Sequence, residues 1–330
     1  MIQIAISVAP QPNLDLTLMK QCGVEHAVGG ISLNPVPGAG EDEQPWSYSS
    51  LKRAKEAYEE NGLTLSVIES RPPMEKIKLG LPGRDEEIDV VCALLRNMGA
   101  LGIPVWCSMW MPILGVMRTS YELPTRAGAQ VSGFDHEQLR HEPLTEYGVV
   151  PEAQQWENLR YFLQRVVPVA EAAQVKMAMH PDDPPRSPVR GLGRIMTSPE
   201  NFQRLLDLVD LPANGLTFCQ GCFTEMNIDV PRWIRHFAGA GRMHFAHYRN
   251  INKGGTADHF SETFHDEEGE ADMYEAMKAY IESGFTGPMR PDHAPTMEGE
   301  SNDHPGYALQ GRLMAVGYMK GLMEAIIKGR

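Results

Sequence analysis

The feature that most constrains the fold of this chain is a regular alternation of short apolar segments with longer amphipathic ones. The short segments, rich in β-branched and other apolar residues, predict strands at 2–7, 26–29, 63–69, 103–108, 175–180, 215–219, 242–247 and 285–290. The amphipathic segments between them predict helices, among them 50–61, 85–99, 156–173, 199–209, 272–283 and 306–327. Such βα alternation is typical of a parallel sheet. Eight units in 330 residues predict an α/β fold of the (β/α)₈ TIM-barrel type.

The length of 330 residues is compatible with one large domain or two smaller ones. The βα alternation continues unchanged on both sides of 109–155, a segment rich in Pro, Gly and polar residues. We therefore expect a single domain over 1–330, with 109–155 as a long loop or lid after the fourth strand; an interdomain linker is the alternative. A doubly wound open sheet is the alternative fold. Its dinucleotide-binding form has no support, because no G-x-G-x-x-G follows the first strand.

The charge and composition of the chain disfavour several classes of partner. With 43 acidic and 30 basic residues the net charge is −13, and no dense run of Lys and Arg is present. Nucleic acid and anionic membrane surfaces are therefore poor partners. No apolar run approaches the roughly 18 residues of a membrane-spanning helix, and no basic segment precedes the first apolar stretch. Five cysteines are too few for a disulfide framework, so we expect a cytoplasmic protein in a reducing compartment.

Residues with metal-binding and acid-base chemistry end several predicted strands. In a parallel barrel the active site lies at these carboxyl ends. The residues there are Glu69, His180, Cys219, His247 and, just past the eighth strand, Asp292 and His293. The fifth to eighth ends thus offer imidazole, thiolate, imidazole and carboxylate on strands about 5 Å apart. Such a set suits a divalent ion of the Zn, Mn, Fe or Co type.

The strand period distinguishes between neighbouring candidates. His244 and His247 are three residues apart, so they face opposite sides of a strand, and we assign His247, at the strand end, to the barrel interior. Cys219 closes its strand, whereas Cys222 lies in the turn beyond it. Their C-x-x-C spacing also fits a redox motif or a zinc knuckle, but a structural zinc site normally needs a second ligand pair, and none is present at similar spacing.

Arginines in the loops after the strands suggest an anionic ligand. The string HPDDPP at 180–185 is followed by Arg186, Arg190 and Arg194, and Arg249-Asn250 follows His247. Guanidinium groups near a metal would bind a carboxylate in a bidentate manner. A rigid surface loop with solvated arginines is the alternative reading.

Taken together, these strings resemble the mannonate dehydratase family, whose members are metal-dependent sugar-acid hydro-lyases with a xylose-isomerase-like barrel. The resemblance spans most of 63–326 and rests on VIES (67–70), MPIL with Arg118-Thr119, PVAEAAQVKMAMHPDDPP (168–185), GLGRI (191–195), TFCQG (217–221), HYRN (247–250), ETFH (262–265), ADMYE (271–275), MRPDH (289–293) and HPGY (304–307). HPDDPP together with RPDH and PGY is far more specific than any one motif.

The resemblance implies roles for individual residues. The metal ligands would be His180, Cys219, His247 and Asp292, the same four that the strand ends select, with Mn²⁺ as the usual ion and Zn²⁺, Fe²⁺ or Co²⁺ as alternatives. The acid-base groups would be His293 and Tyr307, although a Tyr opening a last helix is by itself usually a packing residue. The residues assigned to the substrate are Glu69, Arg118, Arg186, Arg194, Arg249, Asn250 and Glu262. A homodimer is expected by analogy with the family.

The chain departs from the family pattern at positions that face the substrate. The family's N-terminal Arg-Trp-Tyr-Gly is absent, and Ile4-Ala5-Ile6-Ser7 stands there instead. Val116-Met117 precede Arg118 where the family usually has Asp-Trp, Ala294 replaces a favoured Gly, and the excursion after the fourth strand is shorter than in many members. The metal and acid-base residues are all present.

The reaction that the resemblance implies is β-elimination of water from D-mannonate to give 2-keto-3-deoxy-D-gluconate. The divalent ion and the arginines would stabilise the enediolate, while one of His293 and Tyr307 removes the C2 proton and the other protonates the departing hydroxyl. Three alternatives remain open at this point. They are a dehydratase acting on another sugar acid, a metal-dependent sugar isomerase or epimerase of the same barrel class, and a non-catalytic protein that binds sugar acids.

Overall fold

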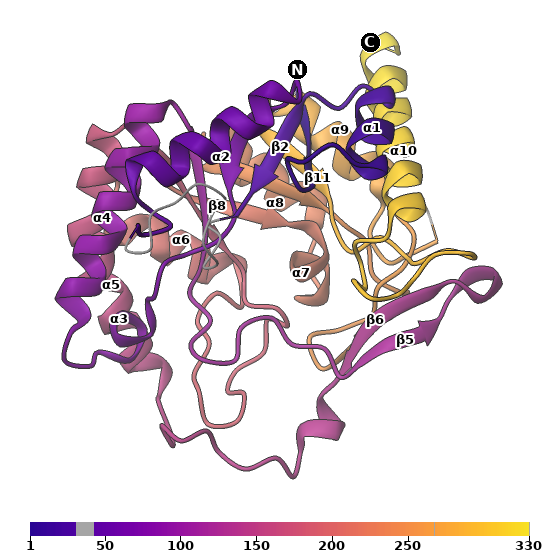
Figure 1. The fold of residues 1–330 in the computed structure, drawn as a ribbon. Helices are drawn as coiled ribbons and strands as arrows, with labels where there is room; N and C mark the ends of the chain where they lie inside the picture. Colours follow the sequence, from indigo (N-terminus) through magenta and orange to yellow (C-terminus); the bar gives the residue numbers. More distant parts are fainter. Residues whose placement is uncertain (31–42, 267, 330) are drawn as a thin grey trace.

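A closed barrel of eight parallel strands forms the centre of the protein in a computed structural model, which describes residues 1–30, 43–266 and 268–329 (Figure 1). The order of neighbouring strands is β1-β11-β9-β8-β7-β4-β3-β2. The barrel strands are β1 (Gln3–Ser7), β2 (His26–Gly29), β3 (Thr64–Ile68), β4 (Val105–Met109), β7 (Lys176–His180), β8 (Asn214–Cys219), β9 (Met243–Tyr248) and β11 (Pro288–Pro291). The predicted TIM-barrel fold is therefore confirmed, with the eighth strand starting three residues later than predicted.

Helices surround the barrel and cover its outer face. They are α1 (Leu14–Gln21), α2 (Tyr48–Glu60), α3 (Glu75–Leu79), α4 (Arg84–Leu101), α5 (Glu152–Ala172), α6 (Pro199–Leu208), α7 (Gln220–Glu225), α8 (Val230–Gly239), α9 (Met273–Glu282) and α10 (Leu309–Lys328). Several begin with a side-chain cap that satisfies a free backbone N–H: Ser198 caps α6, Asp229 caps α8 and Asp272 caps α9. None of the described helices is both long and apolar enough to cross a membrane.

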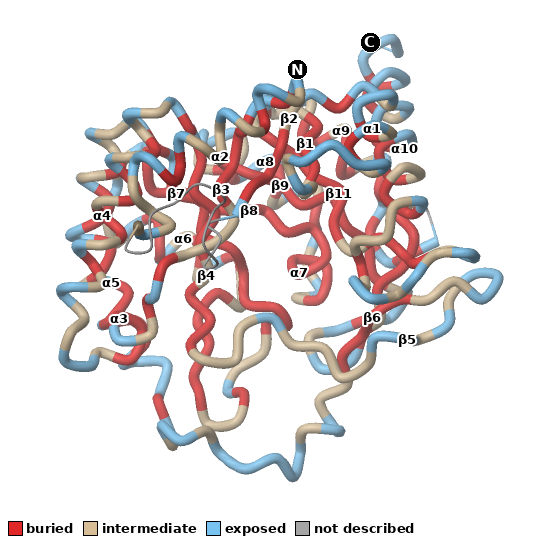
Figure 2. The backbone as a smooth tube through the Cα atoms, viewed as in Figure 1, coloured by how far each residue is buried: buried red, intermediate tan, exposed pale blue. Residues whose placement is uncertain are grey.

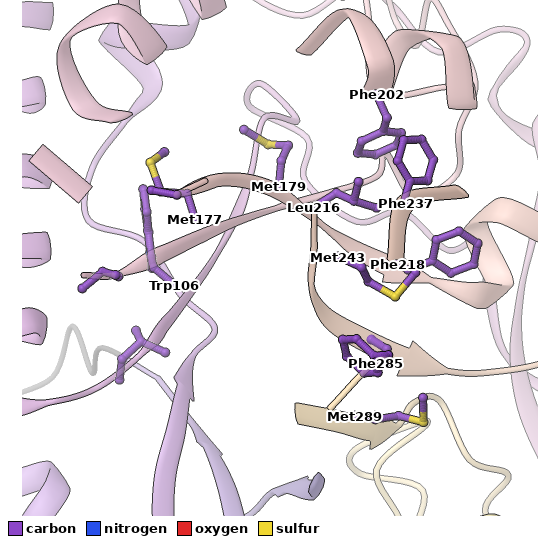
Figure 3. Close-up of a cluster of buried hydrophobic side chains, with 14 of the residues drawn as sticks. Trp106, Met177, Met179, Phe202, Leu216, Phe218, Phe237, Met243, Phe285 and Met289 are labelled. Atoms are coloured by element: carbon purple, nitrogen blue, oxygen red, sulfur yellow. The ribbon is translucent and has the colours of Figure 1, made fainter. Parts of the chain in front are cut away.

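Alternate residues of each strand face two different apolar regions. Small and medium side chains and one phenylalanine fill the inside of the barrel, namely Ala5, Val28, Val67, Val105, Cys107, Ala178 and Phe245. Larger side chains point outwards and pack against the helices, and Figure 3 shows Trp106 of β4, Met177 of β7 and Phe218 of β8 in this layer with Phe202 and Phe237 from helices α6 and α8. The strands are consequently buried along almost their whole length, while the outer helices alternate between buried and exposed residues (Figure 2). Because of this alternation, only every second residue near the carboxyl end of a strand points into the barrel interior.

The excursion predicted at 109–155 forms ordered structure. It contains the hairpin of β5 (Ser120–Pro124) and β6 (Gln130–Asp135) and the 3₁₀ helices η1 (Arg126–Gly128) and η2 (His136–Leu139). Strand β10 (His259–Ser261), which follows β9, pairs with β6 and completes a three-stranded antiparallel sheet. The hairpin lies at the end of the molecule opposite to the two termini (Figure 1). Because β4 and β7 on either side of the excursion pair directly, we continue to propose one domain over 1–330.

Candidate metal and acid-base site

Four metal-binding side chains meet at the carboxyl end of the barrel interior. His180 ends β7, Cys219 ends β8, His247 is the penultimate residue of β9, and Asp292 directly follows β11. Ala178 and Phe245 belong to the interior cluster, so the residues two positions later, His180 and His247, face inwards as well. The strands bring the four residues together because neighbouring parallel strands end at the same rim.

The donor atoms of Cys219, His247 and Asp292 all lie within 4.8 Å of one another, and His180 adjoins this set through Cys219 and His247. His180 Nε2 is 3.2 Å from His247 Nδ1, and His247 Nδ1 is 3.5 Å from Asp292 Oδ2. Cys219 Sγ is 4.0 Å from the same Asp292 oxygen. All four residues are buried, with at most 4% of their surface exposed to solvent. Two imidazoles, a thiolate and a carboxylate that converge in this way fit a divalent ion of the Zn or Mn type.

Each histidine is oriented by a partner on its other nitrogen. His180 Nδ1 lies 2.7 Å from the Pro181 carbonyl, which leaves Nε2 directed at the cluster. His247 Nε2 lies 3.0 Å from Glu69 Oε1, which leaves Nδ1 directed at the cluster. Such outer partners fix the ring orientation and tautomer of metal-binding histidines. Glu69, which the sequence assigned to the substrate, lies in this structure against His247.

Arg290 connects Glu69, the partner of His247, with the proposed metal ligand Asp292. Its Nη1 lies 2.5 Å from Asp292 Oδ1, and its Nε lies 2.9 Å from Glu69 Oε2. Burial raises the pKa of Glu69, but the charges of Arg290 and His247 outweigh it and lower the pKa to about 2. Sequence reasoning did not select Arg290. The signal was available, because Arg290 stands two residues before Asp292 and so faces the same side of the strand.

His293 and Tyr307 lie side by side next to the proposed ligands. Their rings meet edge to face with centroids 5.8 Å apart. Tyr307 Oη is 3.4 Å from Asp292 Oδ1, and His293 Nε2 is 3.7 Å from the same oxygen. His293 has a φ of 47°, a conformation that costs a non-glycine residue free energy and often occurs at functional sites. The two proposed acid-base groups are therefore within reach of one small molecule.

Glu262 orients His293. Its Oε1 lies 2.8 Å from His293 Nδ1, and its side chain is buried. Burial raises the pKa of Glu262, but the charges of Arg249, His293 and Arg118 outweigh it and lower the pKa. An ionised carboxylate only accepts hydrogen bonds, so His293 donates from Nδ1 and its Nε2 stays free to exchange a proton. The sequence assigned Glu262 to the substrate, whereas its contacts here are with protein groups.

A buried network of charges supports this arrangement. Arg118 pairs with Asp183 and Glu262 at 2.6 and 2.7 Å. Arg249 is completely buried and pairs with Glu225, Glu262 and Asp183 at 2.8, 2.7 and 3.1 Å. Burial raises the pKa of Glu225 well above its usual range. A protonated Glu225 leaves two carboxylates for two guanidinium groups, so the network is balanced in charge. Arg118 and Arg249, both predicted to bind the substrate, are thus engaged by carboxylates of the protein.

Three other residues assigned to the substrate hold loops of the protein. Arg186 pairs with Asp258 at 2.8 Å and lies partly exposed. Arg194 is buried, and its guanidinium donates to the carbonyls of Asp183, Pro184 and Gly115. Asn250 donates to the carbonyls of Asp266 and Ala271 and accepts from two backbone N–H groups. In the described part of the chain these side chains shape the rim around the proposed ligands.

A cavity adjoins the site on the side of β1 and β2. It has a volume of about 690 Å³, and its lining includes Ser7, Val28, His304, Tyr307 and Arg312. Tyr307 thus stands between the cavity and Asp292. The cavity thus shares Tyr307 with the site, and the four proposed metal ligands are not part of its lining.

Sequence reasoning did not assign a role to three buried residues of the site besides Arg290, namely Asp183, Cys222 and Glu225. Asp183 and Cys222 were visible within HPDDPP and the C-x-x-C string. No sequence pattern pointed to Glu225. Its place in the site depends on contact with Arg249, which follows β9, whereas Glu225 lies in α7.

Comparison with known proteins places these features in a family. A sequence model described as D-mannonate dehydratase matches residues 6–146 and 138–330. A mannonate dehydratase from Thermotoga maritima is 39% identical over 339 residues, which cover 93% of this chain and 92% of that protein. The crystal structure of mannonate dehydratase from Streptococcus suis superposes with a TM-score of 0.90 at 33% identity, covering 99% of this chain and 94% of that one. A xylose isomerase-like TIM barrel protein from Mycobacterium smegmatis shares the fold, with a TM-score of 0.57 at 14% identity over 94% of this chain and 88% of that one.

Proposed function

This chain belongs to the D-mannonate dehydratase family of hydro-lyases, and on that premise we propose that it converts D-mannonate to 2-keto-3-deoxy-D-gluconate and water. The observation that carries the proposal is the position of His293 and Tyr307 beside four converging metal-binding side chains. Elimination of water next to a carboxylate requires a base for the C2 proton, an acid for the departing hydroxyl and a cation for the developing negative charge, all at one place.

The ligands of the cation would be His180, Cys219, His247 and Asp292, and we propose Mn²⁺ as the ion. When bound, a divalent ion acts as a Lewis acid that stabilises the negative charge developing on the substrate carboxylate. Glu69 and the Pro181 carbonyl hold the two imidazoles with one nitrogen each facing the ion. Arg290 holds Glu69 and Asp292 in place through ion pairs with both carboxylates.

His293 and Tyr307 would move the protons. Imidazole is the most common general base at neutral pH, and His293 Nε2 is the nitrogen that Glu262 leaves free, so we assign it to the C2 proton. A phenol with an ordinary pKa of about 10 keeps its proton at neutral pH, so Tyr307 is suited to protonate the departing 3-hydroxyl. The distal hydroxyls of the sugar acid would extend into the cavity beyond Tyr307.

The cellular setting follows from the same proposal. A small sugar acid is a metabolic intermediate, and the five cysteines are all unpaired, three of them within the site or next to it. We therefore propose a cytoplasmic enzyme. A homodimer, expected from the family resemblance, is tested by light scattering of the purified protein.

The decisive experiment is a mass-spectrometric screen of aldonic and uronic acids with the Mn²⁺-loaded protein. We expect D-mannonate to yield a product lighter by one water, and the activity to disappear on treatment with a chelator and return with Mn²⁺. An isomerase or epimerase would leave the mass unchanged. Turnover of a different sugar acid, with D-mannonate inert, would contradict the proposed substrate and direct attention to the divergent segments 4–7 and 115–117.

A further inference from the structure

Two buried cysteines lie in contact at the proposed metal site, and the proposed mechanism uses only one of them. Cys219 ends β8, and Cys222 lies one turn later in α7. Their sulfur atoms are 3.4 Å apart, and neither residue is exposed to solvent. Cys222 also forms a set of close donor atoms with His180 and Cys219. The second sulfur therefore stands beside a ligand sulfur without a part in proton transfer.

The surroundings of the pair favour reaction between the sulfurs. Arg249 Nη1 lies 3.5 Å from Cys219 Sγ and 3.4 Å from Cys222 Sγ. The same guanidinium therefore contacts both sulfurs of the pair. The sulfurs would have to approach from 3.4 Å to about 2.05 Å to form a bond. Cys219 stands immediately before α7 and Cys222 lies in its first turn, so the pair has the C-x-x-C spacing at a helix start that is found in redox-active proteins.

We propose that Cys219 and Cys222 are an oxidative modification site, at which a hydroperoxide produces a disulfide that withdraws Cys219 from the metal ligands. The second half of this inference rests on the proposed function, because it takes Cys219 as a ligand. A disulfide sulfur carries no thiolate charge, so the ligand set would lose its only sulfur anion. Bound metal and the disulfide therefore exclude each other.

The reaction is balanced by one hydroperoxide. The Cys219 thiolate attacks a peroxide oxygen, the O–O bond breaks, and Cys219 becomes a sulfenic acid. Cys222 then attacks the Cys219 sulfur, and the sulfenic hydroxyl leaves as water with the Cys222 proton. Two thiols and one hydrogen peroxide give one disulfide and two waters. A thiol reductant reverses the change and returns Cys219 to the metal site.

The test compares metal-free and Mn²⁺-loaded protein treated with hydrogen peroxide and then with an alkylating agent. We expect the metal-free protein to form a peptide that contains both cysteines, lacks two hydrogens and takes up no alkylating agent. Saturating Mn²⁺ should slow this at least about tenfold, since metal at ten times its Kd leaves roughly one site in ten free. The oxidised protein should fail to bind Mn²⁺ in a direct binding assay until it is reduced.

Two variants serve as controls. In Cys222→Ser the disulfide cannot form, so we expect Cys219 to be oxidised to sulfinic or sulfonic acid, which a thiol reductant does not reverse. Cys92→Ser removes another buried cysteine, from helix α4, and should leave the modification unchanged.

The possible outcomes distinguish the disulfide itself from the role of Cys219 as a metal ligand. Direct oxidation of Cys219 to sulfinic acid in the unmutated protein, or a disulfide with Cys107 instead, would overturn the modification site. A Cys219–Cys222 disulfide that forms equally fast with and without Mn²⁺, and leaves Mn²⁺ binding intact, would confirm the modification but refute Cys219 as a metal ligand.

Discussion

At the scale of single residues, the site separates side chains that would touch the substrate from side chains that hold them. His293 and Tyr307 face the proposed ligands directly, whereas Glu262 and Glu69 act on the far side of His293 and His247. Substitution of the two glutamates should therefore produce different losses, one in turnover and one in metal affinity.

Glu262→Gln should lower kcat by at least about tenfold. The neutral amide lacks the negative charge with which the carboxylate fixes the tautomer of His293. Metal affinity should change less, since among the described residues Glu262 reaches the proposed ligands only indirectly, through His293 and through Arg249, which lies 3.5 Å from Cys219 Sγ. His293→Asn alone should cost about 10²–10⁴-fold. Adding Glu262→Gln to His293→Asn should cause little further loss, because the two residues act as a unit. Steady-state kinetics of the single and double variants measure this.

Glu225→Gln is a matched control for that experiment. Glu225 pairs with the same Arg249 but has no contact with His293 among the described residues. Its raised pKa means that the folded protein already favours the neutral acid, which Gln resembles. A loss of kcat as large as that of Glu262→Gln would show that the buried network, and not the orientation of His293, sets the rate.

Glu69→Gln should weaken metal binding by about 10–100-fold, the usual effect of removing a carboxylate behind a ligand histidine. The substitution takes away the charge that faces His247 Nε2 and one of the two carboxylates around Arg290. Competition with a chromogenic chelator measures the affinity. Glu59→Gln, which changes an exposed residue of α2 paired with Lys55, should leave it unaltered. Unchanged metal affinity in Glu69→Gln would place the ion elsewhere.

The four proposed ligands could be predicted from the sequence because two simple regularities apply to them. Parallel strands end at one rim, and alternate residues face the interior. The contacts of Arg118, Arg249 and Glu262 with other protein groups could not be predicted in the same way. An arginine in a loop looks the same in sequence whether it meets a substrate carboxylate or a carboxylate of the protein, and the contacts with Asp183 depend on how the loops fold.

At the scale of elements, the three-stranded sheet connects loops that carry parts of the site. Arg118 lies two residues before β5, and Glu262 immediately follows β10. The Thr119 N–H donates to the Gly133 carbonyl, and the Glu262 N–H donates to the Ser132 carbonyl, so β6 holds both segments. The sheet therefore fixes the distance between two members of the charge network.

Gly133→Ala should disturb this sheet. A Cβ at residue 133 would lie 2.7 Å from the Phe260 carbonyl oxygen and 2.5 Å from Leu123 Cδ1, so β10 would have to move away from β6. We expect a loss of about 1–3 kcal/mol in stability, measured by urea unfolding, together with a lower kcat/KM. Gly317→Ala in α10, where an added Cβ meets nothing within 4 Å, should instead stabilise by about 0.5–1 kcal/mol. Full activity in Gly133→Ala would show that the sheet does not position the site.

The elements of the barrel could be predicted, but this sheet could not. Each barrel strand has an apolar core of several residues, whereas β10 is only three residues long and finds its partner more than a hundred residues earlier in the chain. Helix α8 was missed although it has a start signal, with Asp229 as the cap and Pro231 in the first turn.

At the scale of the whole molecule, the barrel concentrates charge in its interior that the net charge of −13 does not reveal. Arg118, Arg249 and Arg290 are each buried or nearly so, and each lies against carboxylates. In the described part of the chain, these guanidinium groups lie within the protein and are matched by its own carboxylates. The net charge predicts that nucleic acid is a poor partner, and it gives no information about the charges inside the barrel.

The barrel wall also contains a buried histidine that should make the whole fold sensitive to acid. His244 faces outwards from β9, where its Nδ1–H donates to the Met177 carbonyl. Burial lowers the pKa of His244 to about 4, despite this hydrogen bond, and the nearby charges of Lys176 and Arg242 act in the same direction as burial. The folded protein therefore keeps His244 neutral at pH values where the unfolded chain protonates it.

Stability should consequently fall as the pH drops from about 6.5 towards 4, because the unfolded chain binds a proton that the folded protein does not. At pH 5.0 the His244 contribution amounts to about 2 kcal/mol relative to pH 7.5. His244→Asn keeps a donor for the Met177 carbonyl but does not titrate. We expect urea unfolding to show that the variant loses about 2 kcal/mol less than the unmutated protein between these two pH values. An equal loss in both proteins would mean that His244 is solvated in the folded state and that the acid sensitivity of the barrel arises from its carboxylates.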